Sequence, residues 1–316
     1  MVKALLLVAV VGACCVSAHE LRPRMSMRGH AAPVHLEPAM SHKLATQARA
    51  APAPLMAASA VAPPAPPSLL RRCIAEAIGT GLIVKLGCGA VCAAKFANSG
   101  MGLFGIAVSF GIAVAIAIFA AGPLSGAHLN PAITLGFVSV GKAPLKEAPF
   151  YILAQIAGAF VASAGLYGMF APGIAATELA SGVVRGSVGS ASTFAGAFAG
   201  QPNLALTSAL GAFIAEAWAA AILAFSVSVV FDKDAGMAPG LAPMMVGAVV
   251  SALICVVGPL TGCLINPARD LGPRIVAAIA GWGSAAMPFA WVYSLGPIFG
   301  AIAGFNLFKL LIERRR

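Results

Sequence analysis

Two short stretches decide the fold of this chain: Ser-Gly-Ala-His-Leu-Asn-Pro-Ala at residues 125–132, and Thr-Gly-Cys-Leu-Ile-Asn-Pro-Ala at residues 261–268. An apolar segment with the sequence Ala-Glu-Ala precedes each of them, at residues 75–77 in the first half and 215–217 in the second. The glutamate and the Asn-Pro-Ala triplet therefore recur in the same order and at similar separation. The chain is one module used twice.

The composition places most of the chain in lipid. Of 316 residues, 60% are hydrophobic and only 9% are charged, whereas a soluble domain carries charge on roughly a quarter of its residues. The net charge of +10 could suit a nucleic acid, but no basic stripe is interleaved with aromatic side chains. We therefore expect a lipid bilayer as the surroundings and no nucleic acid as a partner.

Six stretches are long enough to cross about 30 Å of hydrocarbon, which takes ~20 mostly apolar residues. They run approximately over residues 70–94, 102–122, 148–170, 205–231, 239–258 and 288–312. Two further apolar pieces, 130–140 and 266–279, are too short to span, and each begins with Asn-Pro-Ala.

Each half of the chain has three spans, an odd number, so the second half must enter the membrane from the opposite side. We predict an all-α membrane protein with six transmembrane helices, two re-entrant half-helices and an inverted 3+3 repeat. Repeat one is expected over residues 69–170, a loop over 171–204 and repeat two over 205–316.

The first 68 residues differ from the rest. Lys3, an apolar run over residues 4–16 and the small residues that follow are typical of a secretory signal peptide. The Arg-rich, acid-poor continuation is typical of an organelle transit peptide, and the Pro/Ala tract over residues 52–67 predicts disorder. An unstructured cytosolic tail is the alternative.

Loop charges predict the orientation. One side carries Arg71, Arg72, Lys142, Lys146, Lys233, Lys309 and the basic residues 314–316, and the other carries fewer: Lys95, Arg185, Arg269 and Arg274. The richer side should face the cytoplasm or its equivalent. A cleaved signal peptide would leave the mature N-terminus on the opposite side. A two-step route into an organelle of plastid type, or a retained leader, removes that conflict; the plasma membrane is the alternative destination.

Each triplet suits a helix that begins inside the membrane. Asn is a favoured N-cap, Pro at the first helical position lacks an N–H that would be orphaned anyway, and Ala allows close contact. A broken helix is tolerated there only beside protein or water, so the pair implies a wet pore. We predict that Asn130–Pro131–Ala132 and Asn266–Pro267–Ala268 meet near the midplane. Their amides can donate to a solute, and the two helix dipoles disfavour cations and protons.

Three further residues are singled out by their charge. Arg269 follows the second triplet, and its five donors can replace water around a hydroxyl while its charge repels cations. Glu76 and Glu216 lie in apolar helices, where a carboxylate needs partners.

The remaining titratable candidates receive the plainer interpretation. His128, beside the first triplet, is interpreted as a hydrogen-bonded loop histidine, with a pH gate as the alternative. Cys88 and Cys92 share a helix face, and we expect packing rather than a metal site there.

These stretches resemble the aquaporin or major intrinsic protein family over essentially residues 69–312, and most of all its glycerol facilitator branch. The matching segments are 125–136 (SGAHLNPAITLG), 184–187 (VRGS), 258–273 (GPLTGCLINPARDLGP) and 280–283 (AGWG). Asp270 resembles the acidic residue that glycerol channels carry at this position, and Arg274 resembles their basic position. The resemblance also implies a homotetramer, and it implies that Glu76 and Glu216 support the re-entrant loops; a proton relay is the alternative for these glutamates.

The family's narrow filter, carried over by resemblance, comprises Phe110, Ile254, Cys263 and Arg269. Glycerol facilitators usually combine two aromatics and a glycine with the arginine, and water-selective members combine Phe, His, Cys and Arg. Phe110 and Cys263 resemble the water type, and Ile254 resembles neither. The opening would have one polar corner and apolar walls, along which a small polyol or urea could slide its carbon side.

The resulting function prediction is a passive channel for glycerol, water and other small uncharged solutes, without a cofactor. A water-selective aquaporin is the alternative within the class. An ion-coupled secondary transporter also uses inverted repeats and broken helices, and only Glu76 and Glu216 could serve it. No Ser/His pair or His-Glu metal motif lies in the core, so we do not expect an enzyme.

Overall fold

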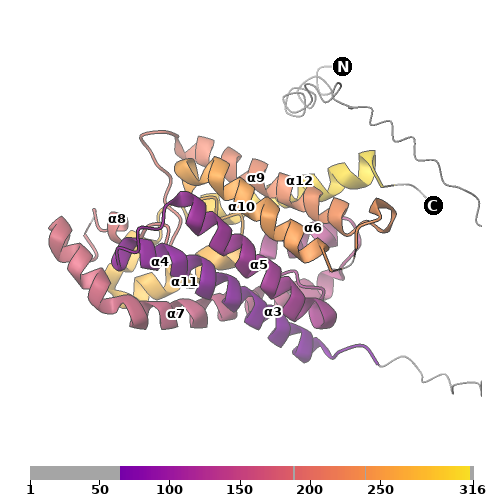
Figure 1. The fold of residues 1–316 in the computed structure, drawn as a ribbon, viewed down its shortest axis with the longest axis horizontal. Coiled ribbons are helices and arrows are strands. Elements are labelled where there is room, and N and C mark those ends of the chain that lie inside the picture. The colour runs from indigo at the N-terminus through magenta and orange to yellow at the C-terminus, as the bar shows by residue number, and fades with distance from the viewer. Residues whose placement is uncertain (1–64, 188, 239, 314–316) are drawn as a thin grey trace, which may run out of the picture. The chain divides into compact units, whose positions relative to one another are not determined.

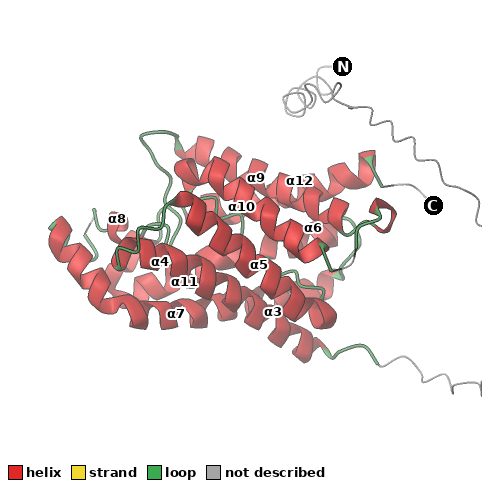
Figure 2. Cartoon of the chain, viewed as in Figure 1, coloured by secondary structure: helices red, strands yellow, loops and turns green. Residues whose placement is uncertain are grey.

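The structure, a computed structural model, describes residues 65–187, 189–238 and 240–313. Most of the predicted leader, residues 1–64, lies outside the described residues. Within the described part the regular elements are helices, and Figures 1 and 2 show them running alongside one another with loops at their ends.

Among the described residues, six helices are long and apolar enough to cross a membrane, which confirms the predicted six-span architecture. The first span consists of α3 (Leu69–Ile83), the π-helical turn η1 (Val84–Cys88) and α4 (Gly89–Phe96). The others are α5 (Leu103–Ser125), α7 (Ala148–Ser181), α9 (Ala209–Val230), α10 (Ala242–Thr261) and α12 (Ala290–Leu311).

Two shorter helices begin at the Asn-Pro-Ala triplets: α6 (Pro131–Ser139) and α11 (Pro267–Ala277). The remaining short helices lie in connections and are η2 (Leu145–Glu147), α8 (Ala191–Phe194), η3 (Lys233–Ala235), η4 (Ala278–Trp282) and η5 (Gly283–Ala286).

One boundary differs from the sequence prediction. The third span was expected to end near residue 170, but α7 continues to Ser181. Pro172 and Gly173 lie inside this helix without ending it, and the helix ends at Gly182, which has a left-handed backbone (φ 63°). The loop between the repeats therefore begins at residue 182.

The helix contacts follow the repeat. Helix α3 packs against α7, as α9 packs against α12, and α5 packs against α10 between the two halves. Half-helix α6 lies beside α12, and α11 lies beside α7 (Figure 1). Each half-helix is therefore held against the last span of the opposite repeat.

Glycines at matched places allow these contacts. A Cβ on Gly158 in α7 would collide with the carbonyl oxygen of Ala77, and a Cβ on Gly300 in α12 would collide with that of Ala217. Small residues let membrane helices approach to backbone contact in this way. Since Ala77 and Ala217 directly follow the two glutamates, the close approach occurs at the level that the glutamates occupy.

Candidate functional site: a pore between two half-helices

The two asparagines cap the half-helices and also tie them to each other. The Oδ1 of Asn130 accepts from the backbone N–H of Ala132 at 2.9 Å, and the Oδ1 of Asn266 accepts from Ala268 at 3.0 Å. The Nδ2 of Asn130 donates to the carbonyl of Ile265 at 2.8 Å, and the Nδ2 of Asn266 donates to that of Leu129 at 2.8 Å. Each amide keeps a second N–H, and both asparagines line the same cavity.

The loops that lead into the triplets have an unusual backbone, and it is the same in both halves. Ala127 and Leu129 have φ of 51° and 53°, and Cys263 and Ile265 have φ of 51° and 46°. Non-glycine residues in this region cost of order 1–3 kcal/mol each and persist only where their surroundings hold them. The two loops therefore need strong support.

Glu76 supplies that support in the first half. It is fully buried, and its carboxylate accepts from the Ser125 hydroxyl at 2.6 Å and from the backbone N–H groups of His128 and Leu129 at 2.9 and 2.6 Å. The side-chain amide of Gln155 donates to it as well, at 2.8 Å. Four donors around one carboxylate satisfy the partner requirement of a buried charge.

Glu216 has the equivalent place in the second half. It is fully buried and accepts from the Thr261 hydroxyl at 2.6 Å and from the backbone N–H groups of Leu264 and Ile265 at 3.0 and 2.7 Å. Glu76 and Glu216 are therefore both occupied by donors of the loops. This arrangement argues against their use as ion-coupling sites.

The four filter candidates all line the cavity: Phe110, Ile254, Cys263 and Arg269. The guanidinium of Arg269 is 5.0 Å from the ring centre of Phe110, and its Nη2 donates to the carbonyl of Gly196 at 3.2 Å. Its Nη1 is buried and has no hydrogen-bond partner among the described residues. A buried donor without a partner costs about 1–3 kcal/mol, so this N–H group suits a passing solute.

The cavity has a volume of about 590 Å³, and its lining extends from these four residues to residues 231–234, which follow α9. Its middle is lined mostly by apolar side chains of α5, α9 and α10, among them Val114, Leu223 and Val250. Charged residues line its far end, including Lys142 and Glu313, which form an ion pair at 3.0 Å.

Asp270 and Arg274 do not line the cavity. Both are fully buried, and Arg274 donates to Asp270 from its Nε at 2.9 Å and from its Nη2 at 3.0 Å. Asp270 also accepts from the backbone N–H of Gly200 at 2.7 Å, and Arg274 donates to the Gly200 carbonyl at 2.9 Å. The pair therefore fastens the segment around Gly200 to α11.

His128 lines the cavity, with its Nδ1 at 3.2 Å from the Thr134 hydroxyl. Its ring centre lies 4.8 Å from that of Phe137 and 5.0 Å from that of Tyr151. The histidine is therefore enclosed by aromatic rings and has a hydrogen-bond partner.

Sequence reasoning missed several supporting groups. The Tyr151 hydroxyl donates to the Ser125 carbonyl at 3.0 Å, and the Tyr293 hydroxyl donates to the Thr261 carbonyl at 2.8 Å. Their matched places in the two repeats were a usable signal. No sequence signal pointed to the Gly196 carbonyl, since a backbone acceptor leaves no trace in the side chains.

Known proteins resemble this chain over most of its length. It is 38% identical over 255 residues to a glycerol uptake facilitator protein of Pseudomonas aeruginosa, covering 78% of this chain and 91% of that protein. It is 36% identical over 252 residues to human aquaporin-9, covering 78% and 84%. The X-ray structure of the aquaglyceroporin from Plasmodium falciparum matches with a TM-score of 0.68 at 29% identity, over 78% of this chain and 97% of that one.

The family profile described as major intrinsic protein matches residues 65–308, which include all six spans and both half-helices except the last helical turn of α12. The chain is a multi-pass integral membrane protein and belongs to the major intrinsic protein family.

Proposed function

We propose that this protein is a passive channel for glycerol, water and other small uncharged solutes. Two kinds of observation support the proposal. The similar proteins include a glycerol uptake facilitator and an aquaglyceroporin. The predicted constriction, formed by Phe110, Ile254, Cys263 and Arg269, also combines one unpartnered buried donor, the Nη1 of Arg269, with apolar walls.

A polyol has a hydroxyl side and a carbon side, and the constriction offers a contact for each. The free Nη1 of Arg269 donates to a solute hydroxyl, and the carbon side of the solute lies along Phe110 and Ile254. The donated hydrogen bond replaces one that the solute loses on leaving water, so a dry passage does not leave the hydroxyl unpaired. Deeper in the pore, the second amide N–H of Asn130 and that of Asn266 can also donate to a solute hydroxyl in place of water.

Ions are excluded by fixed charge. The N-termini of α6 and α11 meet at the asparagines, and each carries about half a positive elementary charge from its helix dipole. Arg269 adds a full positive charge at the constriction. Cations and protons meet a barrier at both places, whereas an uncharged solute does not.

Selectivity for water alone is the second candidate, favoured by Phe110 and Cys263. A histidine at the position of Ile254 would narrow the opening and add a donor. Isoleucine does neither, which favours the wider specificity.

Stopped-flow light scattering on liposomes that contain the full-length chain tests the proposal. Both osmotic water permeability and glycerol permeability should exceed those of protein-free liposomes. A rise in water permeability alone would favour the water-selective alternative, and no rise in either would contradict the channel.

The assembly and its location follow the family resemblance. We propose a homotetramer with one pore per subunit, in an internal membrane of plastid type that the leader helps the protein reach. Native mass spectrometry in mild detergent would report the mass of four chains, and a fluorescent fusion at the C-terminus would report the membrane. A monomeric mass or a plasma-membrane signal would contradict the respective statement.

A further inference from the structure

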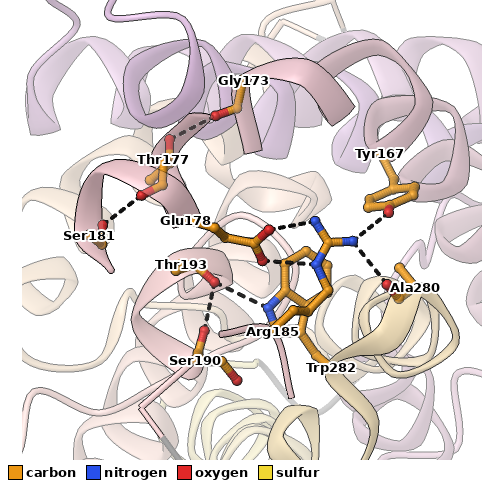
Figure 3. A network of polar contacts seen from close by, with 10 residues as sticks. All are labelled: Tyr167, Gly173, Thr177, Glu178, Ser181, Arg185, Ser190, Thr193, Ala280 and Trp282. Carbon is orange, nitrogen blue, oxygen red and sulfur yellow. Dashed lines mark hydrogen bonds and ion pairs between the residues drawn. The ribbon is translucent and has the colours of Figure 1, made fainter. Parts of the chain in front are cut away.

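A group of residues at the C-terminal end of α7 surrounds Arg185, which follows the last residue of α7 (Figure 3). The Nε and Nη2 of Arg185 donate to the two carboxylate oxygens of Glu178 at 2.9 and 2.7 Å. Its Nη1 donates to the Tyr167 hydroxyl at 2.7 Å and to the Ala280 carbonyl at 3.0 Å. Its guanidinium carbon lies 4.4 Å from the ring centre of Trp282. We call these five residues the Arg185 clamp.

The clamp joins two parts of the chain that are distant in sequence. Glu178 and Tyr167 belong to α7, whereas Ala280 and Trp282 belong to η4, which continues half-helix α11. Hydrogen bonding to Glu178 raises the pKa of Arg185, so the side chain stays a cation. A bidentate carboxylate pair and a stacked aromatic ring use the planar guanidinium fully, so lysine is not an equivalent residue here.

Trp282 also contacts residues 193, 194 and 198 and so links the clamp to residues 194–200, which we call the 194–200 turn. The indole N–H donates to the Thr193 hydroxyl at 3.1 Å (Figure 3). The indole ring centre lies 5.3 Å from that of Phe194 and 6.5 Å from that of Phe198. All four side chains are buried. The two phenylalanines thus anchor the 194–200 turn against Trp282, Phe194 edge-on and Phe198 stacked.

The 194–200 turn supplies the only hydrogen-bond acceptor that the Arg269 guanidinium has among the described residues. Gly196, with φ of 79°, turns its carbonyl to the Arg269 Nη2 at 3.2 Å, and the Gly196 N–H donates to the Ala199 carbonyl at 2.8 Å. Moving this turn therefore moves the acceptor that orients the filter arginine.

We propose that Arg185 is a positioning residue for Arg269: through Trp282 and the 194–200 turn it holds the Gly196 carbonyl in place, and so contributes to the preference between glycerol and water. The proposal rests on the proposed function. It does not require that Arg185 touch the solute.

The test uses the full-length chain in liposomes and a double-mutant cycle. Arg185→Gln should lower the ratio of glycerol to water permeability by about threefold or more, within the range in which coupled residues act at a distance. A merely structural role would lower both permeabilities in proportion to the folded protein and leave the ratio unchanged. In the Arg269→Ala background, Arg185→Gln should have no further effect on the ratio. Additive effects in that cycle would contradict the proposal.

Two further variants keep the test decisive. Tyr167→Phe removes a single hydroxyl from the clamp and should lower the ratio of glycerol to water permeability as Arg185→Gln does. It replaces Arg185→Gln as the test if that variant fails to fold. Arg72→Gln is the matched control, since Arg72 forms an equivalent bidentate pair with Glu147, at 2.7 and 2.9 Å, at the opposite end of the bundle. It should leave the ratio unchanged.

Amide hydrogen exchange separates this proposal from the proposed function. Arg185→Gln should speed exchange in peptides that cover residues 194–200, and Arg72→Gln should not. If the wild-type channel conducts no glycerol but exchange responds as stated, the proposed function fails and the clamp's action on the turn holds. If exchange of the turn is unchanged in Arg185→Gln, the clamp proposal is wrong whatever the wild-type channel conducts.

Discussion

The guanidinium of Arg269 lies over the ring of Phe110, with its carbon 5.0 Å from the ring centre. This contact joins a charged and an aromatic side chain of the cavity lining, one from half-helix α11 and one from span α5. It leaves the Arg269 Nη1 without a partner in the described part of the chain. The contact therefore orients the arginine without using any of its N–H groups in a hydrogen bond.

Ile254→His should make the channel more selective for water. The imidazole adds a donor opposite Phe110 and narrows the opening, so glycerol permeability should fall about tenfold or more while water permeability stays within about threefold, since fixed polar groups change specificity by such factors. Stopped-flow measurements with both solutes check this.

Ile254→Leu is the control for that variant, because it keeps the volume and adds no polar atom. Its permeabilities should remain close to those of the wild-type channel. Equal losses of both permeabilities in Ile254→His would show that the position does not discriminate between the solutes.

Asn266→Asp should weaken the exclusion of cations. The carboxylate can still cap α11 at Ala268, but it cannot donate to the Leu129 carbonyl, and its negative charge offsets the dipoles of the two half-helices. Proton or potassium flux, followed with a pH-sensitive dye or a potential-sensitive dye, should rise above the wild-type level.

Asn266→Ser separates the two effects, since serine also caps a helix but brings no charge. It should keep cations out. If cation flux in Asn266→Ser equals that in Asn266→Asp, the barrier depends on the lost hydrogen bond from Asn266 to the Leu129 carbonyl and not on charge.

Glu216→Gln should destabilise the protein by about 3 kcal/mol, in the range for breaking a buried charged hydrogen-bond group. One amide oxygen must then serve donors that both carboxylate oxygens now accept, namely the Thr261 hydroxyl and the N–H groups of Leu264 and Ile265. Thermal unfolding in detergent measures the loss. A proton-coupled transporter would instead show altered pH dependence of uptake with unchanged stability.

Gly300→Ala should prevent normal folding, because the added methyl group meets the Ala217 carbonyl and surrounding backbone. Backbone cannot move aside as the end of a side chain can. Gly168→Ala in α7 is the matched control, since its Cβ meets nothing within 4 Å. Fluorescence-detected size-exclusion chromatography should show aggregation for the first variant and a wild-type profile for the second.

The architecture could be read from the sequence because the repeat places chemically matched residues at matched positions. The glutamates, the Asn-Pro-Ala triplets and the six apolar runs together leave one topology, and the family profile covers the region they define. The sequence also contained a sign of the loop support, since a hydroxyl residue precedes a glycine at matched places, Ser125 and Thr261. In the structure both glycines have a left-handed φ and both hydroxyls donate to a glutamate.

Other features depend on contacts that the sequence does not encode locally. The extension of α7 to Ser181 passes through Pro172 and Gly173, two residues that often end a helix, so the sequence did not indicate it. The Gly196 acceptor is a backbone atom, and its importance appears only when Arg269 lies beside it. Asp270 was singled out by family resemblance alone, and only the structure shows that its carboxylate accepts from Arg274 and Gly200.

The most direct test of passive conduction is the uptake of labelled glycerol into liposomes that contain the full-length chain, followed to its plateau with and without imposed proton or sodium gradients. We predict a faster approach than in protein-free liposomes to the same plateau, at equal internal and external concentrations under every gradient. Accumulation above the external concentration when a gradient is imposed would contradict a passive channel.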